Sequence, residues 1–131
     1  MPVFSARSQK NLSGCHESLI LVCHHAIRLY DFAVTCGHRG EEEQHKAFLD
    51  GLSDKDYPDG KHNKKPSEAV DLVPCPIDWK YLPPFYFLGG VVMTVAHNLG
   101  VALRWGGDWD RDGDFKDNTL IDLGHFELVD P

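Results

Sequence analysis

The sequence predicts an α+β fold in which helices flank a small antiparallel sheet. Two observations support this prediction. Apolar residues recur at helical spacing in the first third of the chain and again after a proline pair, and short β-prone runs separate and follow these segments. With 131 residues the chain can bury one hydrophobic core but is too short for two ordinary domains, so we expect residues 1–131 to form a single domain.

The first half of the chain is predicted to hold two helices with one strand between them. Residues 14–31 carry apolar side chains at helical spacing, with Ser13 or Ser18 as a potential cap. Residues 32–36 form a short apolar run that ends at a glycine, which is typical of a strand. Residues 41–49 open with three acidic residues, and these favour a helix start because they face the positive end of its dipole.

The second half is predicted to contain a long loop, three strands and a further helix. Residues 50–66 are rich in Asp, Lys, Gly and Pro, which indicates a surface loop, and a loop of this length in a small domain is often functional. The proline pair at 83–84 can open a helix, which Gly100 would end. The expected strands span residues 68–73, 101–105 and 119–129.

Composition excludes several classes of protein. The net charge is −7, and no Lys/Arg-rich run interleaves with aromatic residues, so we expect no nucleic-acid partner. No apolar run approaches the roughly 20 residues of a membrane span. The N-terminal segment lacks the pattern of a secretory signal, so we expect a soluble monomer that is made in the cytoplasm. Four cysteines without a CxxC pair favour reduced thiols over disulfides.

Two separated segments hold the residue types of a catalytic zinc site. Such a site needs three protein ligands and one open position for water, and a nearby acid or base must move that water's proton. His62 and Asp71 stand in the first segment, and Asp122 and His125 stand in the second. The spacing alone leaves the metal site open, because two histidines and one aspartate are unremarkable in a chain with 8 His and 20 acidic residues.

The sequence motifs around these residues are more specific evidence than their spacing. The string KHNKKPSEAVDLVPCPIDW resembles the HN-x-x-PS-x-AVD-x-x-P-x-PIDW element of phage-type peptidases in the superfamily of D-alanyl-D-alanine carboxypeptidases and L-alanyl-D-glutamate endopeptidases. LRWGGDWD followed by DLGHFEL resembles the second element of that family. FSARSQKNLSGCHESL and GHRGEEEQ extend the resemblance over nearly the whole chain. It implies a fold like that of hedgehog domains and D,D-peptidases.

Transferred residue by residue, the resemblance implies a zinc peptidase site. The zinc ligands would be His62, Asp71 and His125, and Asp122 would be the catalytic acid and base. Arg39, in the GHRGEEEQ segment, would hold the substrate carboxylate or polarise the scissile carbonyl.

Two glycines depart from the family pattern. Gly60 replaces a serine two residues before the first histidine, and Gly124 replaces a proline before the last one. In a regular strand Asp122 would point away from the face of His125, so its assignment requires a bend near Gly124. If the strand is regular, Glu127 becomes the substitute because it shares the face of His125.

The resemblance therefore implies a zinc-dependent endolysin that acts on bacterial peptidoglycan at the cell wall and hydrolyses the L-alanyl-D-glutamate bond of its stem peptides. Two alternatives stay open. One is a D-alanyl-D-alanine carboxypeptidase or dipeptidase of the same family. The other is a noncatalytic binding module on the same fold, although a binder would have no need of all four site residues.

A second cation site is suggested by an acidic repeat. Asp108, Asp110, Asp112 and Asp114 are spaced like the opening of a calcium loop. The twelfth position is Thr119 instead of the usual bidentate Glu, so an ordinary EF-hand is not expected. A calcium site and a solvated acidic turn both remain open.

Overall fold

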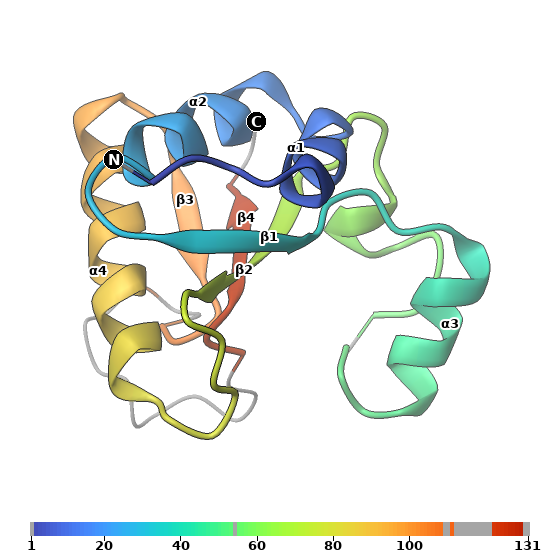
Figure 1. Cartoon of the computed structure of the whole chain (residues 1–131). Helices are drawn as coiled ribbons and strands as arrows, with labels where there is room; N and C mark the ends of the chain where they lie inside the picture. The colour runs from blue at the N-terminus through green and yellow to red at the C-terminus, as the bar shows by residue number, and fades with distance from the viewer. Residues whose placement is uncertain (1, 54, 109–110, 112–121, 130–131) are drawn as a thin grey trace.

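The structure, a computed structural model, describes residues 2–53, 55–108, 111 and 122–129 (Figure 1). The helices are α1 (Ala6–Ser13), α2 (Glu17–Ala26), α3 (Glu41–Leu49) and α4 (Pro83–Asn98), with a short 3-10 helix η1 (Lys61–Asn63). The strands are β1 (Phe32–Cys36), β2 (Ala69–Pro74), β3 (Leu103–Trp105) and β4 (His125–Leu128).

The four strands form one antiparallel sheet in the order β1-β2-β4-β3. The last strand in the sequence lies between β2 and β3, and its register places Asp71 opposite His125. On the other side of β2, Cys36 is the partner of Asp71, after an irregularity in β1. The predicted α+β fold with a small antiparallel sheet is confirmed, and the sheet brings residues from distant parts of the sequence side by side.

The alternating direction of side chains along β2 and β4 separates the core face from the face that carries Asp71 and His125, where β2 also buries Ala69 and Val73. Val70, Leu72, Phe126 and Leu128 are buried in the hydrophobic core, which α1, α2 and α4 complete. Figure 1 shows α4 at one side of the sheet and α3 at the other. Because successive side chains of a strand point to opposite faces, the residues between these apolar positions lie on the other face of the sheet.

Most sequence-predicted elements are present with nearly the expected bounds, but the helix predicted over residues 14–31 is shorter than expected. Within that range α2 spans Glu17–Ala26, and α1, which ends at Ser13 and is separated from α2 by a break, was not predicted. Backbone pairing causes the break, because His16 N–H donates to the Ser67 carbonyl at 2.8 Å and Ser67 N–H donates to the Gly14 carbonyl at 2.9 Å. His16, and neither predicted serine, caps α2.

The C-terminal part of the chain shows a second difference from the prediction. The strand expected over residues 119–129 begins only at His125, and residues 119–121 lie outside the described part of the chain. By contrast, α4 starts at the proline pair and is followed by Gly100 with a φ of 74°, as predicted. None of the described helices is long and apolar enough to span a bilayer.

Candidate metal centre

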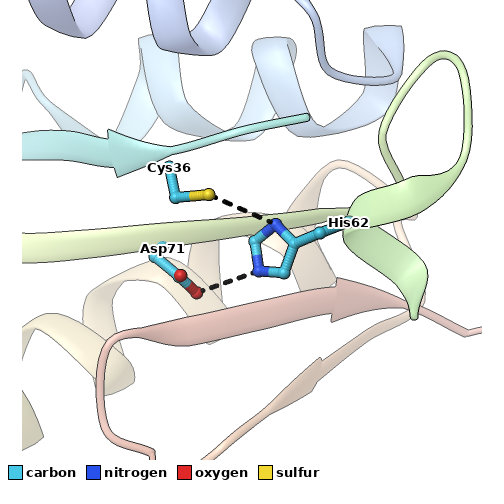
Figure 2. Close-up of side chains that lie close together, drawn as sticks. All are labelled: Cys36, His62 and Asp71. Atoms are coloured by element: carbon cyan, nitrogen blue, oxygen red, sulfur yellow. Dashed lines mark hydrogen bonds and ion pairs between the residues drawn. The ribbon is translucent and has the colours of Figure 1, made fainter. Parts of the chain in front are cut away.

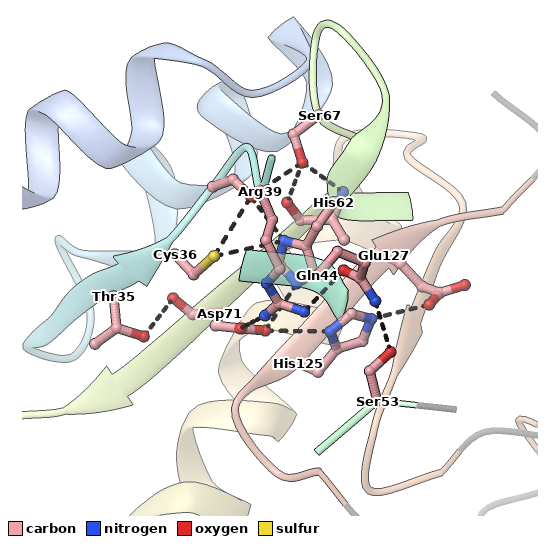
Figure 3. Close-up of polar contacts among 12 residues, drawn as sticks. Thr35, Cys36, Arg39, Gln44, Ser53, His62, Ser67, Asp71, His125 and Glu127 are labelled. Carbon is pink, nitrogen blue, oxygen red and sulfur yellow. Dashed lines mark hydrogen bonds and ion pairs between the residues drawn. The ribbon is translucent and has the colours of Figure 1, made fainter. Parts of the chain in front are cut away.

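Three predicted ligands from three different elements meet beside the sheet. His62 of η1 places Nε2 3.2 Å from Oδ1 of Asp71 on β2. His125 of β4 places Nδ1 3.1 Å from the same oxygen, and the two imidazole rings are 5.1 Å apart (Figure 3). The structure therefore brings together two imidazole nitrogens and one carboxylate oxygen, the donor types that a catalytic zinc ion uses.

The second nitrogen of each imidazole is held by the protein. Nδ1 of His62 lies 2.7 Å from the Gly37 carbonyl, and Nε2 of His125 lies 2.9 Å from Oε1 of Glu127. An N–H donated to these acceptors leaves Nε2 of His62 and Nδ1 of His125 as the nitrogens that face Asp71. Both rings are thus oriented toward a common point by outer contacts.

A thiol also lies beside the first histidine. Sγ of Cys36 is 3.9 Å from Nδ1 of His62, while Asp71 contacts the opposite ring nitrogen (Figure 2). Among the described residues, Cys36, His62 and Asp71 form one group whose potential ligand atoms all lie within 4.8 Å of one another. The sequence analysis did not place this thiol at the site, because the pairing of β1 with β2 is what brings Cys36 beside Asp71.

Asp122 joins the cluster because the chain turns before β4. Ligand atoms of Asp71, Asp122 and His125 lie within 4.8 Å of one another. The turn is closed by His125 N–H, which donates to the Asp122 carbonyl at 3.1 Å. A Cβ at Gly124 would lie only 2.5 Å from the Leu72 carbonyl oxygen, so this close approach requires glycine. The bend on which the assignment of Asp122 depends is present.

Arg39 and a glutamine that the sequence analysis missed form a buried polar network behind Asp71. Nη2 of Arg39 lies 3.2 Å from Oδ2 of Asp71, and Nη1 donates to Oε1 of Gln44 at 3.1 Å (Figure 3). Gln44 is 1% exposed, and its amide also donates to Ser53 and to the Lys55 carbonyl. Gln44 therefore ties Arg39 to the segment that follows α3. Its position at the end of GHRGEEEQ was the only available signal.

The electrostatics of the cluster follow from the close contact of opposite charges. Burial favours the neutral forms, but the Asp71 carboxylate outweighs it and raises the pKa of His62 to about 10 and that of His125 to about 9. For Asp71, burial acts to raise the pKa, but the two imidazoles hold it far below its ordinary value. Asp71 is thus strongly biased toward the ionised form that a metal ligand requires.

The pKa values of the other two carboxyl groups, Asp122 and Glu127, shift in opposite directions. Burial, followed by repulsion from Asp71, raises the pKa of Asp122 above its ordinary value. Burial also acts to raise the pKa of Glu127, but its hydrogen bond with His125 outweighs this effect and lowers the pKa. A carboxyl group with a raised pKa is suited to accept and return a proton, whereas Glu127 is suited to hold His125 in place.

Two cavities flank the cluster, and Asp122 lines both of them. The first, here the polar pocket, has a volume of about 380 Å³ and contains the basic residues Arg39, Lys55, Lys61 and Arg104 together with His62 and His125. The second, here the apolar pocket, has a volume of about 420 Å³ and is lined by Thr35, Asp71, Leu72, Trp79, Leu82, Phe85, Asp122, Leu123 and Gly124. The candidate metal centre therefore lies between surfaces of different chemistry.

The acidic repeat with a possible calcium site is only partly described. Asp108 is paired with Trp105 in an isolated bridge after β3. Asp110, Asp112 and Asp114 lie outside the described residues. The calcium site therefore stays a prediction.

Two histidines, an aspartate and an adjacent carboxylate gathered from η1, the antiparallel sheet and the turn before β4, between two pockets, are the arrangement of a candidate metal-dependent hydrolase. Comparison with known proteins narrows this class. The family model described as phage L-alanyl-D-glutamate peptidase matches residues 2–129, so the chain belongs to that family. This membership confirms the resemblance drawn from the sequence motifs.

Two individual relatives align with this chain over almost its full length. The L-alanyl-D-glutamate peptidase of Escherichia phage T5 is 32% identical over 135 aligned positions, which cover 96% of this chain and 97% of that protein. The crystal structure of the L-Ala D-Glu endopeptidase ChiX of Serratia marcescens superposes with a TM-score of 0.79 at 29% identity, covering 98% of this chain and 90% of that one.

Proposed function

We propose that this chain is a zinc-dependent endopeptidase that acts as a monomer on bacterial peptidoglycan at the cell wall and hydrolyses the L-alanyl-D-glutamate bond of its stem peptides. The observation that carries the proposal is the meeting of His62, Asp71 and His125 beside Asp122 in a chain of the L-alanyl-D-glutamate peptidase family. The family supports the choice of bond, and the cluster supports dependence on a metal.

The residues of the cluster fit zinc as its protein ligands. Two imidazoles and one carboxylate match the donor set of catalytic zinc sites and suit zinc better than hard cations such as magnesium or calcium. Outer contacts from Gly37 and Glu127 fix the two imidazoles, as is usual for ligating histidines. When bound, zinc would polarise the scissile carbonyl and lower the pKa of the attacking water.

Asp122 is the residue to which we assign proton transfer. Asp71 is engaged through both oxygens, by the two histidines and by Arg39, and Glu127 is engaged by His125. Asp122 lines both pockets beside the cluster and has a raised pKa. It would take the proton of the attacking water and deliver it to the amine that leaves.

Arg39 is assigned to the acidic half of the substrate. Its guanidinium has five N–H donors, and the bonds to Asp71 and Gln44 fix its plane at the wall of the polar pocket. The amine half of the scissile bond is a glutamyl residue with a carboxylate next to the reacting nitrogen. Lys61 and Arg104 line the same pocket and add positive charge for this group.

Analysis of the products from purified peptidoglycan tests the proposal. The protein is compared as isolated, after removal of metal with a chelator and after addition of zinc, and the products are identified by mass spectrometry. We expect new N-terminal D-glutamate only when metal is present. Released D-alanine would indicate the carboxypeptidase alternative, and the absence of any product in all three states would indicate a noncatalytic binding module.

A matched variant separates the metal from the proton-transfer step. Asp122→Asn keeps the size of the side chain and leaves the three assigned ligands in place. We expect this variant to bind zinc as the parent protein does and to release products far more slowly. Loss of zinc in Asp122→Asn would instead place this residue among the ligands.

A further inference from the structure

The apolar pocket has the dimensions and the lining of a subsite for an uncharged group. Its volume of about 420 Å³ falls within the range of roughly 300–1,000 Å³ that is usual for ligand pockets. Its walls come mainly from Thr35, Leu72, Trp79, Leu82, Phe85 and Leu123. Asp71 and Asp122 of the candidate metal centre also line this pocket, so a group bound here would lie next to that centre.

The rim of this pocket exposes two large apolar side chains, and one of them packs on a buried aromatic ring. Trp79 is 61% exposed and Leu82 is 46% exposed. The indole packs on the buried ring of Phe85, with ring centres 6.0 Å apart and an angle of 34° between the planes. Phe85 therefore supports Trp79 from one side. An exposed apolar rim beside a polar centre is typical of a ligand-binding groove.

Charge distinguishes the two pockets. The described lining of the apolar pocket contains Asp71 and Asp122 and no basic side chain. The polar pocket is lined by the basic residues Arg39, Lys55, Lys61 and Arg104 as well as by the acidic residues Asp59, Asp122 and Glu127. An anionic group would face only carboxylates among the described charged residues of the apolar pocket, whereas the polar pocket offers it basic partners. The two halves of a substrate that spans Asp122 are thus sorted by charge.

We propose that the apolar pocket binds the acyl half of the scissile bond, which consists of the L-alanyl residue and the N-acetylmuramyl group on its amine. This inference rests on the proposed function. The alanyl half is uncharged and offers a methyl group, and the sugar offers a C–H face that can pack on the indole of Trp79. The glutamyl half then lies in the polar pocket. The scissile carbonyl lies between them, next to Asp122.

Binding of N-acetylmuramyl-L-alanine tests this assignment without any turnover. The zinc-loaded protein, labelled with ¹⁵N, is titrated with this compound, and the indole N–H resonance of Trp79 is assigned from its loss in Trp79→Phe. We expect this resonance to shift on binding. Removal of one aromatic contact in Trp79→Ala should weaken binding about two- to tenfold.

Tyr81→Ala is the matched control. Tyr81 is 59% exposed on the same segment as Trp79, but it does not line the pocket. We expect this variant to bind N-acetylmuramyl-L-alanine as tightly as the parent protein. Leu82→Ala provides a second test from another position on the rim, and it should weaken binding in the same direction as Trp79→Ala.

Two results would overturn the inference. One is an indole resonance of Trp79 that does not move with N-acetylmuramyl-L-alanine. The other is a resonance that moves with γ-D-glutamyl peptides instead, which would reverse the direction of the substrate. Because the readout is binding, it fails separately from the proposed function: a protein that binds the muramyl compound at Trp79 but leaves peptidoglycan uncut supports the pocket and refutes the endopeptidase.

Discussion

Strands β2 and β4 have two faces with different tasks, although the residues of the two faces alternate one by one. On the core face, Leu72 and Phe126 are at most 1% exposed. On the other face, their direct neighbours Asp71 and His125 contact each other at 3.1 Å. A two-residue repeat thus allows adjacent positions to be almost independent: one stabilises the fold and the next lies at the candidate metal centre.

The largest effect is expected at the polar face, from Asp122→Asn. Because the amide can neither accept nor return the proton of the attacking water, kcat should fall by about 10²–10⁴-fold. The free energy of unfolding and the zinc content should stay close to those of the parent protein. Steady-state kinetics on a soluble stem peptide, together with metal analysis, checks this. A decrease in kcat of less than tenfold would contradict the role of Asp122.

Substitution of two adjacent residues on β4 compares the faces directly. Phe126→Ala removes a fully buried ring and should lower the free energy of unfolding by about 3–5 kcal/mol. His125→Gln keeps a polar side chain on the other face and should cost less, about 1–3 kcal/mol, while zinc binding is lost. Urea denaturation of the metal-free proteins measures the free energy of unfolding, and metal analysis measures zinc binding. Equal losses of stability would mean that the two faces of β4 contribute equally to folding, against this prediction.

The sequence predicted the core face better than the contacts of the polar face. Local patterns were sufficient for β1, α3, β2 and α4, because hydrophobic periodicity, acidic residues in a first turn and proline pairs act within a few residues. They were not sufficient at Cys15, where a bridge to Ser67 separates α1 from α2 and delays the start of the predicted helix. Pairing with a segment about fifty positions away in the chain leaves no periodic signal.

At the candidate site, motif resemblance named the proposed ligands, but the contacts of those ligands with surrounding residues had to come from the structure. The resemblance named His62, Asp71 and His125, which the fold brings together. The contacts of Gln44 with Arg39 and of Cys36 with His62 were not foreseen. Each of them depends on the register of the sheet or on the docking of α3, neither of which follows from the residue types alone.

A smaller effect is expected from Glu127→Gln, which tests the outer contact of a proposed metal ligand. Glu127 accepts a hydrogen bond from Nε2 of His125, and its charge favours the ring orientation that leaves Nδ1 toward Asp71. Loss of this charge should weaken zinc binding about 10–100-fold, as is typical of such contacts. Competition with a chromogenic chelator measures the affinity.

Glu68→Gln is the matched control for Glu127→Gln. Glu68 precedes β2 and lies 3.9 Å from the ammonium group of Lys61, so the substitution also removes a paired charge. It does not contact any of the three assigned ligands through its side chain in the described structure. Its zinc affinity should match that of the parent protein. An equal loss in both variants would mean that net charge, and not the contact with His125, controls the affinity.

The smallest effect concerns the cysteines, because Cys15 and Cys23 lie in the core whereas Cys36 lies beside the candidate metal centre. Burial raises the pKa of Cys15 to about 12 and also raises that of Cys23, so both should resist iodoacetamide at pH 8 in the folded protein. Cys36, partly exposed near His62, should react under the same conditions. Peptide mapping by mass spectrometry measures the extent of each reaction, and all four cysteines should react after denaturation. If Cys15 reacted as fast as Cys36 in the folded state, the core around Cys15 would have to open readily. The core face of the sheet could then not be regarded as independent of the candidate site.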